Sequence, residues 1–172
     1  QLIQPSEYLS YAKGYFQETV AQIYPIYQRL LKENDALDFD DLILKTIELF
    51  YNNPQVLKKY QDKFKYILVD EYQDTNHAQY SLTKMLAGLD VNKSPNVCVV
   101  GDFSQSIYSW RGADFQNLSK FKEDFKDTQT FSLSQNYRST QNILDGASSV
   151  IAKNTSHPVL DLWTENPKGE DI

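Results

Sequence analysis

Two adjacent carboxylates follow a short apolar stretch near the middle of the chain. Residues 66–69 read Tyr-Ile-Leu-Val, and Asp70 and Glu71 come directly after them. A carboxylate at the end of such a stretch can hold a Mg²⁺ ion that bridges nucleotide phosphates. A second carboxylate beside it can take a proton from an attacking water molecule, as in a Walker B element. The dipeptide can equally be a structural pair that caps the next helix, because so short a motif often matches by chance.

Two further apolar stretches, one ending at Asp102 and one at Leu133, also run into polar residues. In a parallel sheet, ligands bind beyond the carboxyl ends of the strands. We therefore expect the strands that end at Asp70, Asp102 and Leu133 to be parallel neighbours in one sheet. That arrangement places Asp70 and Glu71 at the same edge of the sheet as Gln105, which follows the second strand.

Strands alternate with helical stretches, which predicts an α/β fold with a parallel sheet flanked by helices. Apolar residues at three- and four-residue steps over 8–31 predict a long N-terminal helix with a core-facing stripe, bent or broken at Pro25. Asp38 is the expected N-cap of the next helix. Residues 66–69 lack polar alternation, so we expect a strand buried on both faces. Further helices are expected over 77–89, 114–125 and 140–151, the last capped by Ser139 or Thr140.

The composition narrows the class of protein. The 172 residues include 17 Lys plus Arg and 23 Asp plus Glu, which gives a formal net charge of −6. This balance argues against a domain that holds nucleic acid mainly through positive charge, but it leaves binding by base stacking open. No apolar run approaches the roughly 20 residues that a membrane-spanning helix needs, so no membrane partner is expected. The single cysteine, Cys98, excludes an internal disulfide framework.

Three longer strings around the polar residues resemble motifs of the UvrD/Rep/PcrA family of superfamily 1 DNA helicases. Residues 68–76 (LVDEYQDTN) resemble motif II, residues 100–113 (VGDFSQSIYSWRGA) resemble motif III, and residues 135–140 (QNYRST) resemble motif IV. Residues 37–43 also resemble the segment that precedes motif II in this family. The resemblance spans roughly residues 30 to 165. It departs from the family at Phe103 and Ser104, where acidic residues are common.

The resemblance implies a nucleotide site built from two parts of the chain. Asp70 corresponds to the Mg²⁺-associated acid, Glu71 to the general base for ATP hydrolysis, and Gln105 to the residue that senses the γ-phosphate. Tyr137 corresponds to the aromatic that stacks on adenine. Arg138 corresponds to the arginine finger, which reaches the γ-phosphate across the cleft between two RecA-like lobes. ATP and Mg²⁺ are therefore the implied cofactors. The plain structural alternatives are a core tyrosine at 137 and a surface ion pair at 138.

The resemblance also implies a DNA contact. Trp110 corresponds to the aromatic on which a base of single-stranded DNA stacks, and Tyr108 lies on the same loop. Arg111 lies on the same loop but corresponds to a further catalytic arginine, near the nucleotide phosphates. An indole beside a polar loop is a stacking platform that tolerates any base sequence. The expected partner is single-stranded DNA or a duplex junction, and the alternative for Trp110 is packing in the core.

The sequence contains no match to G-x-x-x-x-G-K-[ST], the loop whose backbone N–H groups cradle phosphates. Motifs V and VI of the family are not found either. We therefore expect an internal piece of a longer cytoplasmic helicase, inactive alone, with 3′ to 5′ polarity implied by the family. The start at Gln1, without methionine, favours a fragment. Its expected parts are the end of an inserted helical subdomain, the second half of the first RecA-like lobe, and motif IV with the start of the second lobe (1–36, 37–134 and 135–172).

Two other classes of function stay open. A degenerate helicase-like DNA-binding or scaffold module would keep Trp110 but would not need Glu71, Gln105 and Arg138 together. A phosphohydrolase that uses only paired carboxylates and Mg²⁺ would usually need a nucleophilic aspartate or a histidine cluster near the metal, and the sequence shows neither.

Overall fold

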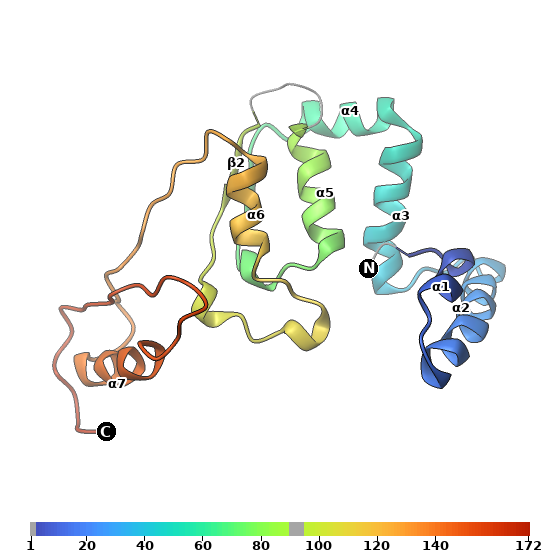
Figure 1. Cartoon of the computed structure of the whole chain (residues 1–172). Helices are drawn as coiled ribbons and strands as arrows, with labels where there is room; N and C mark the ends of the chain where they lie inside the picture. Colours follow the sequence, from blue (N-terminus) through green and yellow to red (C-terminus); the bar gives the residue numbers. More distant parts are fainter. Residues whose placement is uncertain (1–2, 90–94) are drawn as a thin grey trace.

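The computed structural model describes residues 3–89 and 95–172, which form a helix-rich chain with a small parallel sheet (Figure 1). The mixed helix and strand content agrees with the predicted α/β class. No helix in the described ranges combines the length and the apolar character needed to cross a bilayer. The elements, with short 3₁₀ helices labelled η, are α1 (Pro5–Tyr11), α2 (Tyr15–Glu33), α3 (Phe39–Asn52), α4 (Pro54–Lys63), β1 (Ile67–Val69), η1 (Tyr72–Asp74), α5 (His77–Ala87), β2 (Val97–Val99), η3 (Phe103–Gln105), η4 (Ser109–Arg111), α6 (Asn117–Asp124) and α7 (Gln141–Ile151).

The N-terminal helical stretch is divided before Gly14 and not at Pro25. Residues 12–14 separate α1 from α2, and Gly14 has a φ of 87°, which glycine adopts without the clash of a Cβ. Pro25 lies inside α2, which continues past it. The expectation of a core-facing stripe is wrong for much of α2. This helix packs mainly against α1, so side chains such as Tyr15 (87% exposed) and Phe16 remain open to solvent.

Helices α3, α4 and α5 form the middle of the chain. Asp38 caps α3 as predicted, since its Oδ1 accepts a 2.8 Å hydrogen bond from the backbone N–H of Asp41. α3 packs against α4 and α5, and Phe50 is buried beside the ring of Tyr60. Asn76 is the N-cap of α5 and forms a capping box. The capping box fixes the start of α5 a few residues after the end of β1.

The sheet consists of β1 and β2, which pair in parallel with Leu68 opposite Cys98. The apolar core lies on one face, where side chains of β1 and β2 pack against a cluster from η1, α5, α6 and the residue after α6 (Tyr72, Tyr80, Phe121 and Phe125). On the other face Leu68 is 76% exposed and Cys98 is exposed. The prediction that the first strand is buried on both faces is therefore wrong, because within the described residues helices cover one face only.

The expected third strand does not form. Residues 130–133 have no strand partner among the described residues, and Phe131 and Leu133 are exposed. An apolar run becomes a strand only when a neighbouring edge accepts its backbone hydrogen bonds, and here the segment runs as an open connection toward α7. The nearest strand-like contact is a single parallel bridge between Gln135 and Trp163.

α7 and the C-terminal tail pack together. The backbone N–H of Asn136 donates to the carbonyl of Trp163 (2.7 Å), and Nδ2 of Asn142 donates to the carbonyl of Glu170 (2.8 Å). Thr140 occupies the N-cap position of α7 as predicted, although its side chain makes no capping hydrogen bond. Figure 1 shows α7 at the opposite end of the molecule from α1 and α2.

Candidate functional site

The two predicted acids lie at the carboxyl end of β1. Asp70 and Glu71 are both exposed, and Oδ1 of Asp70 accepts a 2.9 Å hydrogen bond from the backbone N–H of Glu71. Glu71 has a left-handed backbone conformation, with φ 49° and ψ 44°. This conformation costs a residue with a side chain ~1–2 kcal/mol. Such a residue persists only where its surroundings hold it, and such positions are concentrated at functional sites.

Gln73 holds Glu71 from the interior of the protein. Its side chain is almost fully buried (1% exposed), and its Nε2 donates a 2.7 Å hydrogen bond to Oε2 of Glu71. Its Oε1 accepts a 3.0 Å hydrogen bond from the backbone N–H of Asp102 at the end of β2. A Cβ at Gly101 would lie only 2.7 Å from this Oε1, so the approach of Gln73 requires glycine there. No role is predicted for Gln73 from the sequence, because nothing in the sequence indicates a hydrogen bond to a residue 29 positions away.

Asp102 extends the connection to the predicted phosphate sensor. Its Oδ2 accepts a 2.9 Å hydrogen bond from Nε2 of Gln105, and its Oδ1 accepts one of 2.9 Å from the backbone N–H of Ser104. Glu71 and Gln105 are thus joined through Gln73 and Asp102 at the carboxyl ends of two parallel strands. The expectation that they share one edge of the sheet is confirmed, although the third strand of that prediction is not.

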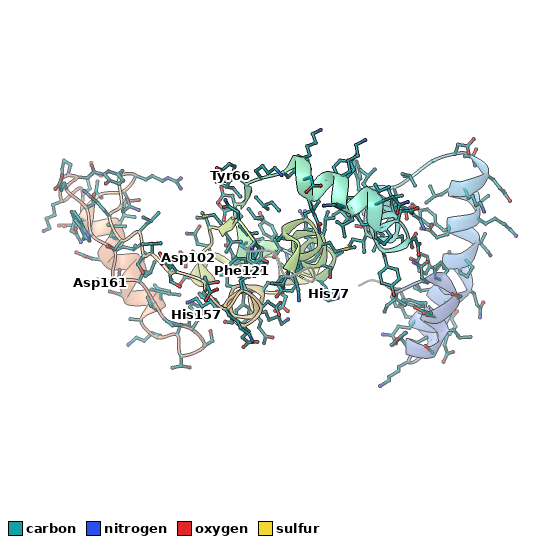
Figure 2. All side chains as sticks on the ribbon, turned by 90° about the horizontal axis from the view of Figure 1, so that it is seen from above. Tyr66, His77, Asp102, Phe121, His157 and Asp161 are labelled. Carbon is teal, nitrogen blue, oxygen red and sulfur yellow. The ribbon has the colours of Figure 1, made fainter. Side chains whose placement is uncertain are left out.

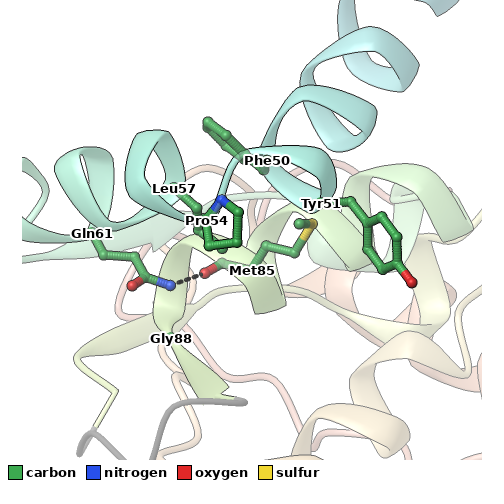
Figure 3. A pocket seen from close by; sticks show the side chains of 7 residues that line it. All are labelled: Phe50, Tyr51, Pro54, Leu57, Gln61, Met85 and Gly88. Atoms are coloured by element: carbon green, nitrogen blue, oxygen red, sulfur yellow. Dashed lines mark hydrogen bonds between the residues drawn. The ribbon is translucent and has the colours of Figure 1, made fainter.

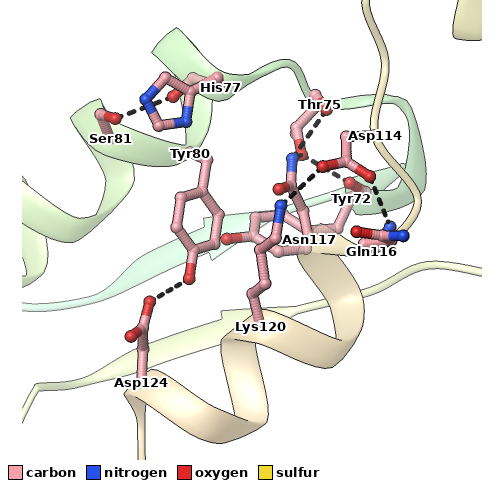
Figure 4. A network of polar contacts seen from close by, with 10 residues as sticks. All are labelled: Tyr72, Thr75, His77, Tyr80, Ser81, Asp114, Gln116, Asn117, Lys120 and Asp124. Carbon is pink, nitrogen blue, oxygen red and sulfur yellow. Dashed lines mark hydrogen bonds and ion pairs between the residues drawn. The ribbon is translucent and has the colours of Figure 1, made fainter.

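A polar network fixes the segment between η4 and α6 against the start of α5 (Figure 4). The buried Asn117 donates from Nδ2 to the carbonyl of Thr75 (2.9 Å), and the backbone N–H of Asp114 donates to the same carbonyl (3.1 Å). Lys120 forms a 2.7 Å ion pair with Asp114. Because Thr75 closely follows Glu71 and Asp114 closely follows Trp110, this network ties the two predicted functional loops to one another.

The core beneath this network contains perturbed tyrosines. Burial, with a smaller contribution from Asp124, raises the pKa of Tyr72 to about 12. Burial and a hydrogen bond to Asp124 also raise the pKa of Tyr80. Burial acts to raise the pKa of Asp124 itself, but hydrogen bonds from Lys84 and Tyr80 outweigh it, and the pKa of this carboxyl lies below its ordinary value. These groups stabilise the packing between α5 and α6.

Tyr108, Trp110 and Arg111 form an exposed cluster. Trp110 is 73% exposed, and its ring centroid lies 6.5 Å from that of Tyr108. The guanidinium carbon of Arg111 lies 4.5 Å from the Trp110 ring centroid and 5.4 Å from the Tyr108 centroid. Core packing of Trp110 is therefore wrong, and an aromatic surface with a neighbouring cation is available to a base and a phosphate.

Tyr137 and Arg138 lie in an exposed turn before α7. Tyr137 is 79% exposed and donates its hydroxyl hydrogen to Oε1 of Gln135 (2.8 Å). Oδ1 of Asn136 accepts hydrogen bonds from the backbone N–H groups of Arg138 and Ser139. The alternatives of a core tyrosine and of a surface ion pair for Arg138 find no support in the described ranges. No hydrogen bond between described residues joins this turn to Glu71 or Gln105.

The carboxylates of Asp70 and Glu71 fit a Mg²⁺ ion that is bound mainly through the phosphates of a nucleotide. Mg²⁺ keeps several waters and usually takes one or two carboxylates together with substrate phosphates. Asp70 and Glu71 supply exposed carboxylates at a strand end, and no group of three or more potential metal ligands occurs within residues 3–89 and 95–172. Asp70 would hold the ion, which would neutralise phosphate charge.

A separate apolar pocket of about 200 Å³ lies between α3, α4 and α5 (Figure 3). None of its lining side chains is charged, and Gln61 uses its Nε2 to bond the carbonyl of Met85 (2.7 Å). The pocket therefore lacks groups for phosphate binding. The strand-end residues remain the candidate site.

Comparison with known proteins places these features in a family. Residues 1–126 match the family described as "UvrD/REP helicase N-terminal domain". The chain is 51% identical over 171 residues to the "ATP-dependent DNA helicase PcrA" of Leuconostoc citreum, which covers 99% of this chain and 22% of that protein. It is 52% identical over 172 residues to the proteins of the same name from Staphylococcus epidermidis and Staphylococcus aureus, which covers 100% of this chain and 23% of each relative. The chain thus spans less than a quarter of the length of these relatives. With the family match over most of the chain and this identity along its whole length, the chain belongs to the UvrD/REP family of superfamily 1 helicases.

Proposed function

We propose that this chain is part of an ATP-dependent DNA helicase or translocase that couples ATP hydrolysis to movement on single-stranded DNA. The observation that carries the proposal is the hydrogen-bonded connection from Glu71 through Gln73 and Asp102 to Gln105. A general base and a γ-phosphate sensor must act on the same phosphoryl group, so a mechanism for ATP hydrolysis needs them at one sheet edge. The relatives named above are ATP-dependent DNA helicases, which agrees with this function.

In this proposal each nucleotide-site residue has a separate task. Asp70 holds Mg²⁺, Glu71 accepts a proton from the attacking water, and Gln105 contacts the γ-phosphate. Tyr137 stacks on adenine, and Arg138 stabilises the charge of the transition state, for which a planar guanidinium is well suited. The exposure of Tyr137 and Arg138 supports these roles, because their side chains are open to a ligand.

The proposed DNA contact consists of Tyr108 and Trp110. A base stacks on Trp110 with Tyr108 beside it. Arg111, on the same loop, is proposed to serve the nucleotide phosphates and so belongs with the catalytic residues. The net charge of −6 is compatible with this mode, since stacking does not depend on a basic surface. Movement from 3′ to 5′ and a cytoplasmic location belong to the same proposal.

The proposed division of the chain into parts is the one that the resemblance to UvrD/Rep/PcrA helicases implies. Residues 1–36 end an inserted helical subdomain, residues 37–134 form the second half of a RecA-like lobe, and residues 135–172 begin a second lobe. The parallel pairing of β1 and β2 with helices on one face supports a partial RecA-like sheet. Because the sequence lacks a P-loop, the 172 residues alone should hydrolyse ATP negligibly.

A single substitution in the full-length protein tests the function. Glu71→Gln keeps the size of the side chain but removes the base, so ATP hydrolysis with single-stranded DNA should fall by roughly 10²–10⁴-fold. Glu18→Gln is the matched control, because Glu18 is an exposed glutamate at the start of α2, away from the site. Phosphate release with Mg-ATP and single-stranded DNA is the assay. Turnover in Glu71→Gln equal to that of Glu18→Gln would instead favour a DNA-binding or scaffold module without ATPase activity.

A further inference from the structure

The segment after α7 contacts the loop after β2 through one histidine. Nε2 of His157 lies 3.1 Å from Oγ of Ser104, and a hydroxyl can donate or accept, so the pair is bonded with either tautomer of the ring. The imidazole also stacks on the ring of Phe103, with centroids 5.6 Å apart and an interplanar angle of 20°. Figure 2 shows His157 near Asp102, which belongs to the same loop as Phe103 and Ser104.

This contact joins two parts of the chain. Across residues 3–89 and 95–172, no other hydrogen bond or ion pair between described residues links residues 3–126 with residues 134–172. Neighbouring residues of the C-terminal tail also contact the imidazole. Nδ2 of Asn154 lies 2.9 Å from Nδ1 of His157, and Oγ of Ser156 lies at the same distance from this nitrogen. The ring is therefore held in place on the tail while it contacts Phe103 and Ser104.

Both sides of the contact lead to residues of the proposed site. The backbone N–H of Ser104 donates to Asp102, which also accepts the hydrogen bond from Gln105. On the other side, the tail that carries His157 continues to Trp163, whose carbonyl accepts from the backbone N–H of Asn136. The side chain of Asn136 in turn holds the backbone of Arg138. His157 therefore stands between the loop of Gln105 and the turn of Arg138.

The two partners of His157 are chemically suited to an imidazole. An aromatic ring at 103 permits stacking with an imidazole, and a hydroxyl at 104 permits a hydrogen bond with either ring tautomer. Phe103 is further supported by Phe115, whose ring meets it edge-on at 6.4 Å. Phe103 and Ser104 therefore hold His157 through two different kinds of contact.

We propose that His157 is a positioning residue for ATP hydrolysis, which holds the loop of Gln105 and the turn of Arg138 in one arrangement. The inference rests on the proposed function, because it assigns a support to two of its catalytic residues. His157 itself touches neither predicted carboxylate nor Tyr137 in the described contacts. Its loss should therefore lower kcat and leave the KM for ATP nearly unchanged.

The test uses the full-length protein that contains this chain. His157→Ala removes both the stack and the hydrogen bond, and kcat for DNA-stimulated ATP hydrolysis should fall roughly tenfold. The KM for ATP should stay within about twofold, since adenine stacking on Tyr137 is retained. His157→Phe keeps a ring on Phe103 and should recover part of kcat. Adding Ser104→Ala to His157→Phe should cause no further loss, because the hydrogen bond is already absent.

His77→Ala is the matched control, since His77 is the other histidine of the chain and lies at the start of α5. Hydrogen exchange of residues 101–108 without nucleotide should be faster in His157→Ala than in this control. Glu71→Gln, measured in parallel, separates the two proposals. If Glu71→Gln abolishes turnover while His157→Ala matches His77→Ala in kcat, the positioning role is wrong and the proposed function stands. If Glu71→Gln retains turnover, the proposed function fails first. Parallel changes of kcat and KM in His157→Ala would also overturn the positioning role.

Discussion

Replacing Gln73 with alanine tests whether a buried amide keeps the general base in place. The substitution removes the hydrogen bond to the carboxylate of Glu71 and the bond from the backbone of Asp102. A hydrogen bond to a charged group contributes ~1.5–3 kcal/mol and a neutral one ~0.5–1.5 kcal/mol. The left-handed conformation of Glu71 is unfavourable by ~1–2 kcal/mol. Without the hydrogen bond from Gln73, Glu71 is therefore free to leave this conformation. The productive orientation of Glu71 should therefore become a minor state.

The expected effect appears in turnover. If about 2 kcal/mol of this stabilisation is lost at the transition state, kcat falls roughly 30-fold, since each 1.36 kcal/mol is a factor of ten. The KM for ATP should change little, because the Gln73 side chain is buried and does not reach a ligand. Steady-state phosphate release by the full-length protein is the assay. Gln79→Ala is the control, since it removes a glutamine of the α5 capping box and affects stability alone. A kcat for Gln73→Ala within twofold of the control would refute the reasoning.

Three further outcomes are expected. Trp110→Ala should weaken single-strand binding about tenfold or more in anisotropy titrations, since stacking contributes ~1–3 kcal/mol per base, and should leave hydrolysis without DNA unchanged. Arg138→Ala should lower turnover by ~10³–10⁵ in the same ATPase assay while DNA affinity is retained. The pKa of Asp124 is lowered in the folded state, so its stabilisation is present above the ordinary value of 3.8 and is lost as pH falls through the folded pKa. Asp124→Asn should flatten the acid side of a plot of unfolding free energy against pH, measured by urea titration, and an unchanged slope would contradict this.

The parts of the fold that depend on local sequence could be predicted. The acids after β1 and β2 mark strand ends because apolar runs followed by carboxylates are visible in the chain itself. Asp38 was identifiable as a cap because its side chain bonds a backbone group three residues away. Residues 130–133 show the same kind of apolar run, but whether such a run becomes a strand depends on a neighbouring edge. That information lies elsewhere in the chain, and here the run has no partner in the described ranges.

In the candidate site, too, some residues could be predicted from the sequence and others could not. The residues expected to touch ATP or DNA could be identified because they stand in motif strings, although their roles stay predictions. The residues that support them could not. Gln73 bonds a residue 29 positions away and His157 one 53 positions away. No periodicity or spacing rule connects such positions, because the hydrogen bonds exist only once the parallel strands and the tail have been placed.

The two aspartates at the strand ends show why position in the sequence alone does not assign chemistry. Both follow an apolar strand, and both could be taken for metal ligands. In the structure, however, Asp102 uses one oxygen for Gln105 and the other for Ser104, so its orientation is fixed by the loop that it organises. Asp70 accepts its hydrogen bond from the backbone of the next residue and faces solvent at the end of β1. A carboxylate that faces solvent can share Mg²⁺ with phosphate oxygens and water, whereas one bonded through both oxygens within its own loop serves better as a scaffold. This difference favours Asp70 for Mg²⁺ and makes Asp102 the branch point from which Gln73, Gln105 and Ser104 are held together.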